Sequence, residues 1–363
     1  MTDLPIRPDL AGRRAYGAPQ LKVPVRLNTN ENPYPPSPEL AADIAASVAR
    51  VASGLNRYPD RDALELRAAL AGYLGHGLTG AETWAANGSN EILQQLMLVF
   101  GGPGRSALGF EPSYSMHPMI SQVTGTRWIA APRSQDFRLE PAEAAAAVAA
   151  EQPDIVFLTS PNNPTGSATP IEVAEAVCAT APGMVIIDEA YAEFARDQSA
   201  TALSLLPRYP RLVVVRTMSK AFALAGARIG YLAADPAVVE AVHLVRLPYH
   251  LSAVTQAVAL AALRHSGELL SSVAAIRTER DALVASLRKI GLEAGDSDAN
   301  FVLFGRFADR HAVWRALLAG GVLIRETGPQ EWLRVSVGTP AETATFLSEI
   351  KQIVDGGAAA VLR

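Results

Sequence analysis

Leu212-Val213-Val214-Val215-Arg216 is followed by Thr217-Met218-Ser219-Lys220 and then by Ala221-Phe222-Ala223-Leu224-Ala225-Gly226-Ala227-Arg228. This stretch places one lysine in a loop of small residues directly after an apolar strand. An amine is nucleophilic only when deprotonated, and an apolar wall or a neighbouring cation lowers its pKa. We therefore expect Lys220 to form a Schiff base with a carbonyl cofactor, and Thr217, Ser219 and Arg228 to supply the hydroxyls and fixed charge that a phosphate site needs.

Two further motifs stand at the ends of apolar runs. Ser160-Pro161-Asn162-Asn163-Pro164-Thr165-Gly166 follows the run 154–158, and Val185-Ile186-Ile187-Asp188-Glu189-Ala190-Tyr191 places a carboxylate at the tip of another run. Short apolar runs alternate with helical patterns here, which predicts an α/β fold with a mostly parallel sheet covered by helices on both faces. Ligands bind beyond the carboxyl ends of such strands, so the three motifs are expected to share one site.

The element pattern changes near residue 249. Before it, we expect strands at 106–110, 154–159, 184–188, 212–216 and 229–233, and helices at 89–100, 113–123 and 171–180. After it, we expect helices at 253–265 and 269–290, a strand at 300–304, a helix at 310–319, strands at 322–325 and 332–337, and a closing helix from Pro340. The predicted division is an N-terminal arm (1–38), a large domain (39–252) and a smaller α+β domain (253–363).

Composition excludes several classes of function. The net charge is −4, with 49% hydrophobic and 19% charged residues, so neither nucleic acid nor an anionic membrane is indicated as a partner. The single cysteine, Cys178, lies in an apolar helical pattern, which indicates a buried side chain and a reducing compartment. Since no secretory signal, membrane span or metal site is predicted, we expect a cytoplasmic protein.

A second anion site is expected after the apolar segment 84–86. Asn87-Gly88-Ser89-Asn90-Glu91 forms a glycine turn before the helical pattern Ile92-Leu93-Gln94-Gln95-Leu96. Free N–H groups and the helix dipole make such an end suited to a phosphate. Ser89 is alternatively a helix cap. We favour the phosphate because Thr217, Ser219 and Arg228 are predicted to serve the same role.

In order and spacing, the three motifs resemble the fold-type I aminotransferases that use pyridoxal phosphate, over nearly the whole chain. The resemblance implies that Lys220 holds the cofactor and then moves a proton, and that Asp188 keeps the pyridine nitrogen protonated. It also implies that Tyr191 and Asn163 contact the ring oxygen and that Tyr114, in Phe110-Glu111-Pro112-Ser113-Tyr114, stacks on the ring. Each assignment has a structural alternative. Asp188 could simply end a strand, Asn163 could belong to an ordinary turn, and Tyr114 could be a packed or surface tyrosine.

The resemblance also implies a homodimer. Asn56-Arg57-Tyr58-Pro59-Asp60 resembles the segment that reaches into the neighbouring subunit's site, where the tyrosine contacts the cofactor phosphate. Composite active sites would follow, although the same residues form common loops. In this family the N-terminal arm joins the small domain and helps to line the site.

Arginines are the expected substrate-binding residues, because a guanidinium matches carboxylate or phosphate oxygens with paired hydrogen bonds. Arg334 lies within the apolar strand Trp332-Leu333-Arg334-Val335-Ser336-Val337, at a position that the family uses for the substrate's acidic group. Arg325, after Val322-Leu323-Ile324, is the second candidate, with an exposed strand end as its alternative.

Several segments resemble the histidinol-phosphate aminotransferases. They are Leu27-Asn28-Thr29-Asn30-Glu31-Asn32-Pro33, Arg57-Tyr58-Pro59, the lysine motif, Val245-Arg246-Leu247-Pro248-Tyr249-His250 and Asn300-Phe301-Val302. The resemblance implies amino transfer between histidinol phosphate and 2-oxoglutarate, with Tyr16, Arg325 and Arg334 on the substrate's phosphate and Asn30 also in the substrate site. One departure is Ala15, where the family has a proline before the tyrosine.

Three alternatives stay open at this point. An aromatic amino acid aminotransferase shares these motifs and differs in its side-chain pocket. A pyridoxal phosphate lyase, such as a threonine-phosphate decarboxylase, uses the same scaffold but breaks a different bond. A catalytically silent effector-binding module belongs to another class, and the chain has neither a helix-turn-helix pattern nor a basic extension to support it.

Overall fold

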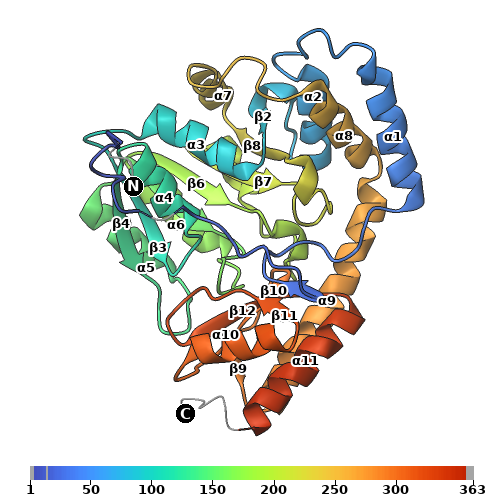
Figure 1. The fold of residues 1–363 in the computed structure, drawn as a ribbon. Coiled ribbons are helices and arrows are strands. Elements are labelled where there is room, and N and C mark those ends of the chain that lie inside the picture. The colour runs from blue at the N-terminus through green and yellow to red at the C-terminus, as the bar shows by residue number, and fades with distance from the viewer. Residues whose placement is uncertain (1–3, 14, 357–363) are drawn as a thin grey trace.

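Seven strands build the central sheet of the computed structural model, which describes residues 4–13 and 15–356. Their spatial order is β2-β8-β7-β6-β5-β3-β4 (Figure 1). The bounds are β2 Thr83–Ala86, β3 Ser106–Glu111, β4 Arg127–Pro132, β5 Ile155–Thr159, β6 Met184–Asp188, β7 Leu212–Thr217 and β8 Gly230–Ala234. Neighbouring strands pair in parallel from β4 to β7, and β8 is antiparallel to both of its neighbours. The predicted mostly parallel sheet is confirmed.

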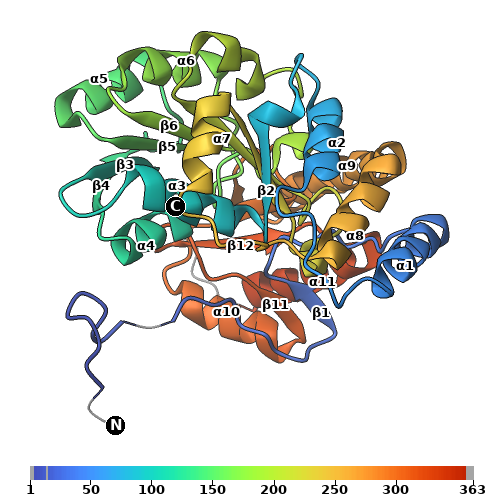
Figure 2. The ribbon, with the colours of Figure 1, turned by 90° about the horizontal axis from the view of Figure 1, so that it is seen from above.

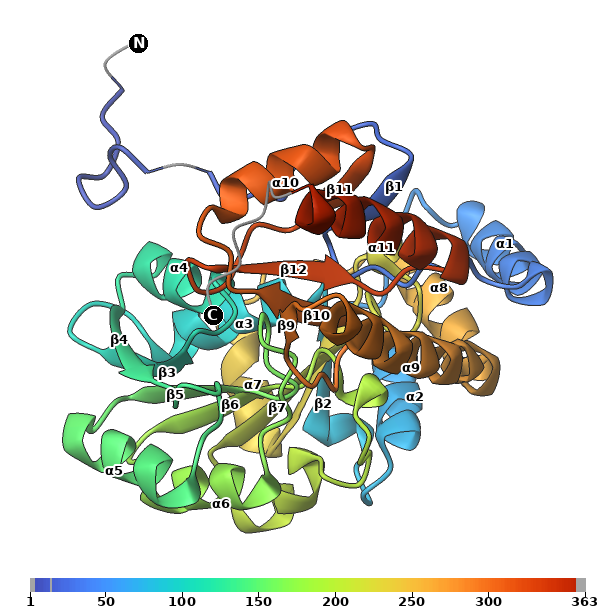
Figure 3. The same cartoon turned by 90° about the horizontal axis from the view of Figure 1, so that it is seen from below.

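Helices cover both faces of this sheet. Helices α5 and α6 lie on one face, and α3 and α4 lie on the other (Figures 2 and 3). The helix bounds are α1 Pro38–Ala52, α2 Leu64–Leu74, α3 Ser89–Phe100, α4 Met116–Val123, α5 Pro141–Glu151, α6 Ile171–Thr180, α7 Pro236–His243, α8 Ala253–Arg264, α9 Ser266–Lys289, α10 Arg310–Ala319 and α11 Pro340–Asp355. No helix in the described ranges is both long and apolar enough to cross a membrane.

Strand β5 shows why the sheet is buried on both sides. Its side chains alternate, so Ile155 and Phe157 enter the core on the face covered by α3, whereas Val156 and Leu158 enter the core on the face covered by α6. All four side chains are at most 2% exposed. Burial on both faces therefore requires apolar residues along the strand. The polar residues come at its carboxyl end and in the loop that follows.

Helix α4 begins later than predicted, at Met116 instead of Ser113. The Ser113 hydroxyl lies 3.0 Å from both Thr159 Oγ1 and Asn162 Oδ1, which ties this segment to the loop after β5. Asn162 Nδ2 also donates to the carbonyl of Pro112 at 3.0 Å. These contacts hold residues 112–115 as a connection that lines the cavity described below.

The C-terminal part carries two small sheets. Strands β9 Glu293–Ala294, β10 Phe301–Gly305 and β12 Trp332–Ser336 are antiparallel in the order β12-β10-β9. Strand β11 Val322–Ile324 pairs in parallel with β1 Val25–Leu27 of the N-terminal arm, a strand too short to be predicted. A bridge between Arg325 and Arg334 joins the two sheets. The arm is thereby held against the C-terminal elements, and the residues after β1 face the central sheet.

Candidate active site

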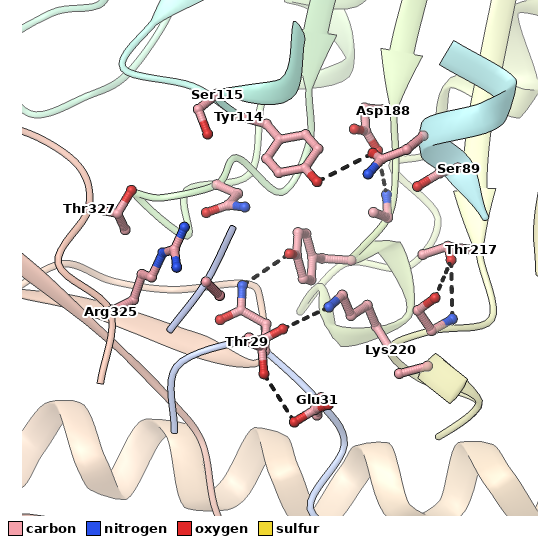
Figure 4. A pocket seen from close by; sticks show the side chains of 18 of the residues that line it. Thr29, Glu31, Ser89, Tyr114, Ser115, Asp188, Thr217, Lys220, Arg325 and Thr327 are labelled. Carbon is pink, nitrogen blue, oxygen red and sulfur yellow. Dashed lines mark hydrogen bonds between the residues drawn. The ribbon is translucent and has the colours of Figure 1, made fainter. Parts of the chain in front are cut away.

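A cavity of about 350 Å³ lies between the central sheet and the arm. Its walls come from the carboxyl ends of β5, β6 and β7, the start of α3, the residues after β1, and the strand β12 (Figure 4). It brings together these predicted site residues: Tyr16, Asn30, Ser89, Asn90, Tyr114, Asn163, Asp188, Tyr191, Thr217, Ser219, Lys220, Arg228, Arg325 and Arg334. Convergent polar groups in one concave site are typical of a ligand site.

Lys220 lies three residues beyond the end of β7 and points into the cavity. Its Nζ donates to the carbonyl oxygen of Thr29 at 2.9 Å and lies 6.0 Å from the centre of the Tyr191 ring. Removal of water from the amine lowers the pKa of Lys220 to about 8, and the positive charges of Arg334 and Arg228 act in the same direction. The amine is thus deprotonated near neutral pH far more often than an exposed lysine.

Asp188 ends β6 and is 2% exposed. One carboxylate oxygen accepts the Ala190 N–H at 3.1 Å, and the other lies 3.2 Å from Nε2 of His117. His117 is itself buried on α4 and stacks on Phe157, with 4.6 Å between ring centres. The histidine therefore orients the carboxylate from behind the cavity. Sequence reasoning missed His117, because a single histidine on an amphipathic helix carries no signal.

The glycine turn before α3 meets Arg228 and β8 at close range. Gly88 has a φ of +87°, and a Cβ on it would lie 2.4 Å from Nη2 of Arg228. A Cβ on Gly230 would lie 2.1 Å from the backbone nitrogen of Ser89. Ser89 is the first residue of α3 and Gly88 occupies the capping position, so the capping alternative for Ser89 is wrong. The helix N-terminus and a guanidinium thus face the same end of the cavity.

Two hydroxyls complete this end. Thr217 Oγ1 lies 3.0 Å from Ser219 Oγ and accepts the Ser219 N–H at 3.1 Å. Nη1 of Arg228 donates to Ser219 Oγ at 3.3 Å and to the carbonyl of Ala225 at 3.0 Å. Arg228 makes no ion pair with a carboxylate in the described part of the chain. This end therefore presents positive charge and donors without a protein anion, which suits a phosphate.

Aromatic and amide side chains form the middle of the cavity. Nδ2 of Asn30 donates to the Tyr191 hydroxyl at 3.0 Å, and the Tyr114 hydroxyl donates to Asn90 Oδ1 at 3.3 Å. Burial raises the pKa of Tyr191 to about 12, so its hydroxyl keeps its proton, which is available for donation to a ligand. The Tyr114 ring lies on the Asp188 side of the cavity (Figure 4), and the Tyr191 ring lies beside Lys220.

The opposite end holds two more arginines. Arg334 is 6% exposed, and its guanidinium donates to Asn163 Oδ1 at 2.5 Å and to the carbonyl of Asn28 at 2.9 Å. Its Nε has no partner among residues 4–13 and 15–356. Arg325 lies over the Tyr16 ring, with 5.8 Å between guanidinium carbon and ring centre. Because a buried cation without a counter-ion is costly, this end is expected to receive an anionic ligand.

Two predicted residues, Gly88 and Tyr58, do not line the cavity. Gly88 supplies backbone next to Ser89, whereas Tyr58 is 79% exposed and stacks on Tyr249, 4.3 Å between ring centres. The structure also adds lining residues that the sequence did not single out: Ala18, Asn28, Thr29, Glu31, Ser113, Ser115, Thr159, Ala190, Ala225 and Thr327. Most of these flank predicted residues in the chain, so the motif spacing was the available signal.

The family model for "Aminotransferase class I and II" matches residues 22–350. The chain belongs to this family. Among curated class I and II aminotransferases, the histidinol-phosphate aminotransferase of Thermobifida fusca is 65% identical over 344 residues, covering 95% of this chain and 94% of that protein. The enzyme of the same name from Corynebacterium glutamicum is 54% identical and covers 98% of both chains.

A solved aminotransferase structure has the same fold. It is the crystal structure of histidinol-phosphate aminotransferase from Sinorhizobium meliloti in complex with pyridoxal-5'-phosphate. The two chains superpose with a TM-score of 0.83 at 27% sequence identity, over 92% of each. The fold-type I architecture predicted from the motifs is therefore confirmed.

Proposed function

We propose that this protein is a pyridoxal-phosphate-dependent histidinol-phosphate aminotransferase, which transfers the amino group of histidinol phosphate to 2-oxoglutarate in histidine biosynthesis. The observation that carries the proposal is the presence of two separate cationic ends in one cavity. Arg228 lies at the end formed by Ser219 and the turn at Gly88. Arg334, which is bridged to Arg325, lies at the end formed by Asn163 and Asn28, and the charges of Arg228 and Arg334 both act on Lys220. Such a cavity accommodates one phosphate from the cofactor and one from the substrate. The names of the relatives support the same activity.

The residues present fit pyridoxal phosphate. A phosphate is matched by the turn at Gly88, whose missing Cβ leaves room for Arg228, and by the hydroxyls of Thr217 and Ser219. The buried carboxylate of Asp188 matches a protonated ring nitrogen. We assign the ring oxygen to Tyr191 and Asn163, the ring face to Tyr114, and further phosphate contacts to Ser89 and Asn90.

When bound, the cofactor supplies an aldehyde that takes up the amino group and a ring that accepts electrons. Lys220 holds that aldehyde at rest, and its amine then removes the proton from the amino-bearing carbon of the substrate. A pKa of about 8 suits a general base working near neutrality. Asp188, oriented by His117, holds the proton on the ring nitrogen.

On the substrate side, Arg334 and Arg325 bind the phosphate of histidinol phosphate, and Tyr16 packs beside Arg325. Asn30 positions the Tyr191 hydroxyl, and we assign Asn30 to the substrate site because it lines the cavity. The same arginine end accepts a carboxylate of glutamate in the second half of the reaction. Two planar guanidinium groups serve both anions, since each offers paired donors.

We further propose a cytoplasmic homodimer in which Tyr58 reaches the partner's cofactor phosphate. The support is that Tyr58, which is 79% exposed, stacks on Tyr249, and that Leu55 and Leu247, which lie close to these two residues in the sequence, are 54% and 74% exposed. Exposed apolar side chains that cluster on a surface indicate an interaction site. Mixing Lys220→Ala with Tyr58→Ala protomers tests composite sites, because each mixed dimer then contains one site with both residues intact. If mixing restores no activity, composite sites are excluded.

Steady-state glutamate formation from 2-oxoglutarate tests the activity. We expect turnover with histidinol phosphate, weak turnover with phenylalanine, and none with the Lys220→Ala variant. Imidazole acetol phosphate should accumulate in step with glutamate. Release of carbon dioxide or inorganic phosphate instead would identify a lyase, and equal rates with phenylalanine would identify an aromatic amino acid aminotransferase.

A further inference from the structure

Glu31 lines the cavity but has no part in the reaction described above. Among the residues that the structure describes, only Asp188 and Glu31 contribute carboxylates to the cavity wall. Asp188 is buried and committed to His117 and the Ala190 N–H. Glu31 is exposed at the mouth of the cavity, on the same side as Thr29 and Lys220 (Figure 4). A second, unexplained negative group therefore stands in an otherwise cationic site.

The backbone that carries Glu31 is firmly held. Asn30 has a φ of +55°, and its N–H donates to Ser336 Oγ at 2.8 Å. Nδ2 of Asn300 donates to the carbonyl of Asn30 at 3.0 Å, and the Asn30 side chain donates to Tyr191. Each of these partners belongs to another element of the site. The backbone next to Glu31 is thus held by three residues, Ser336, Asn300 and Tyr191, of which Tyr191 lines the cavity.

One oxygen of Glu31 is engaged and the other is available. Oε2 accepts the Thr29 hydroxyl at 3.0 Å, while Oε1 has no hydrogen bond within residues 4–13 and 15–356. The carbonyl of Thr29 also accepts a hydrogen bond from Lys220, so Thr29 connects Glu31 to the reacting amine. The nearby charge of Glu31 raises the pKa of Lys220, against the larger lowering by desolvation and by Arg334.

Histidinol phosphate and phenylalanine differ in whether their rings can donate a hydrogen bond to the Glu31 carboxylate. The ring of histidinol phosphate carries an N–H donor and is cationic when protonated, whereas the ring of phenylalanine carries neither. A site with a positioned acceptor discriminates against an analogue that lacks the donor. The arginine end of the cavity cannot make this distinction, because it binds the anionic group that both substrates have.

We propose that Glu31 is a specificity-determining residue that accepts a hydrogen bond from the imidazole ring of the substrate through Oε1. The inference rests on the proposed function, since it concerns which ring the same site selects. Glu31 then acts at the end of the substrate remote from Arg325 and Arg334. Thr29 orients the carboxylate through its hydroxyl and, through its carbonyl, orients Lys220.

The test compares Glu31→Leu, which has no acceptor, and Glu31→Gln, which keeps an acceptor but loses the charge. The matched control is Glu151→Gln, an exposed glutamate at the end of α5. We expect kcat/KM for histidinol phosphate to fall about 10- to 100-fold in Glu31→Leu, the range for a lost hydrogen bond to a charged group, and less in Glu31→Gln. Because the charge of Glu31 also acts on Lys220, kcat/KM for phenylalanine should change much less than kcat/KM for histidinol phosphate in the two Glu31 variants, and neither value should change in Glu151→Gln.

A binding measurement separates recognition from chemistry. In the Lys220→Ala background, calorimetry gives the dissociation constant of histidinol phosphate without turnover, and Glu31→Leu should weaken it by a similar factor. The visible spectrum of the bound cofactor, recorded on the Lys220-containing variants, shows that each is folded and loaded. A preserved ratio between the two substrates would overturn the role of Glu31.

Failure of the Glu31 proposal can be distinguished from failure of the proposed function. An equal loss with both substrates would mean that Glu31 acts through Lys220, and the specificity role would be wrong. If the unaltered protein fails to use histidinol phosphate, the proposed function is wrong, whatever the Glu31 variants do. Selective loss with histidinol phosphate supports both.

Discussion

Replacing Gly88 by alanine should weaken cofactor binding through Arg228. The added Cβ would lie 2.4 Å from Nη2 of Arg228, closer than a van der Waals contact allows. The guanidinium is the far end of a flexible side chain, so it can swing away, but its hydrogen bond to Ser219 at 3.3 Å would then be lost. The phosphate site would lose a charged donor that is held in place by the glycine turn.

Gly88→Ala should have two effects, one on the stability of the protein and one on the binding free energy of the cofactor. The backbone of Gly88 has φ +87° and ψ 162°, a region that is essentially restricted to glycine, which costs about 1–3 kcal/mol of stability for alanine. Displacement of a charged donor from the phosphate costs about 1.5–3 kcal/mol of binding free energy, which is roughly 10- to 100-fold in the dissociation constant.

Gly104→Ala is the control for the first part. Gly104 has a φ of +82°, and a Cβ on it would have no atom within 4 Å. Both variants should unfold at lower denaturant concentration in the cofactor-free form. Only Gly88→Ala should raise the dissociation constant of pyridoxal phosphate, followed by its visible absorbance. An unchanged dissociation constant for Gly88→Ala, or an equal rise in both variants, would refute the reasoning.

Three further predictions follow from the site. Because the pKa of Lys220 is lowered to about 8, capture of pyridoxal phosphate by the cofactor-free protein should accelerate about tenfold per pH unit below 8 and level off above it, in stopped-flow absorbance; a rate that rises up to pH 10 would contradict this. Asp188→Asn, which keeps the shape but not the charge, should bind the cofactor and slow transfer by at least about 100-fold; an unimpaired single-turnover rate would count against the ring-nitrogen role. Arg334→Gln should raise KM for histidinol phosphate about 10-fold or more, and should also lower stability, because Asn163 and Asn28 lose a buried donor; a normal KM would assign the substrate phosphate elsewhere.

Local sequence signals predicted the sheet and the position of its ligand end. Runs of β-branched residues such as Val185-Ile186-Ile187, bounded by turn signals, favour central strands, and the polar residue that ends each run, such as Asp188, marks the edge where ligands bind. The structure has β6 at Met184–Asp188, α3 at Ser89–Phe100 and α6 at Ile171–Thr180, as predicted. Strands β5, β7 and β8 differ from prediction by one residue at their ends.

What the sequence could not show depends on contacts between distant segments. Strand β1 has three residues and exists because β11, almost 300 residues later, offers its edge. His117 matters only because α4 places it against Asp188. Glu31 enters the cavity because Asn300 and Ser336 fix the arm. No periodicity within a short window reports such pairings, since their energetic basis is tertiary.

The predicted division into an arm, a large domain and a small domain stays a prediction, as do the individual roles of the site residues. The placement of Tyr58 shows the reason. Within one protomer it stacks on Tyr249 at the surface, away from the cavity, and its assigned role belongs to a second subunit. The mixed-protomer experiment described above addresses this role directly.

The most direct test of the whole account is a single-turnover experiment on the pyridoxal-phosphate-loaded protein. Loss of the visible absorbance of the bound cofactor is followed after mixing with histidinol phosphate and, separately, with phenylalanine. The account predicts much faster conversion with histidinol phosphate, because its ring carries a donor for Glu31 and the ring of phenylalanine does not. Equal or faster conversion with phenylalanine would contradict the assignment, and a protein without such absorbance would contradict the role of Lys220.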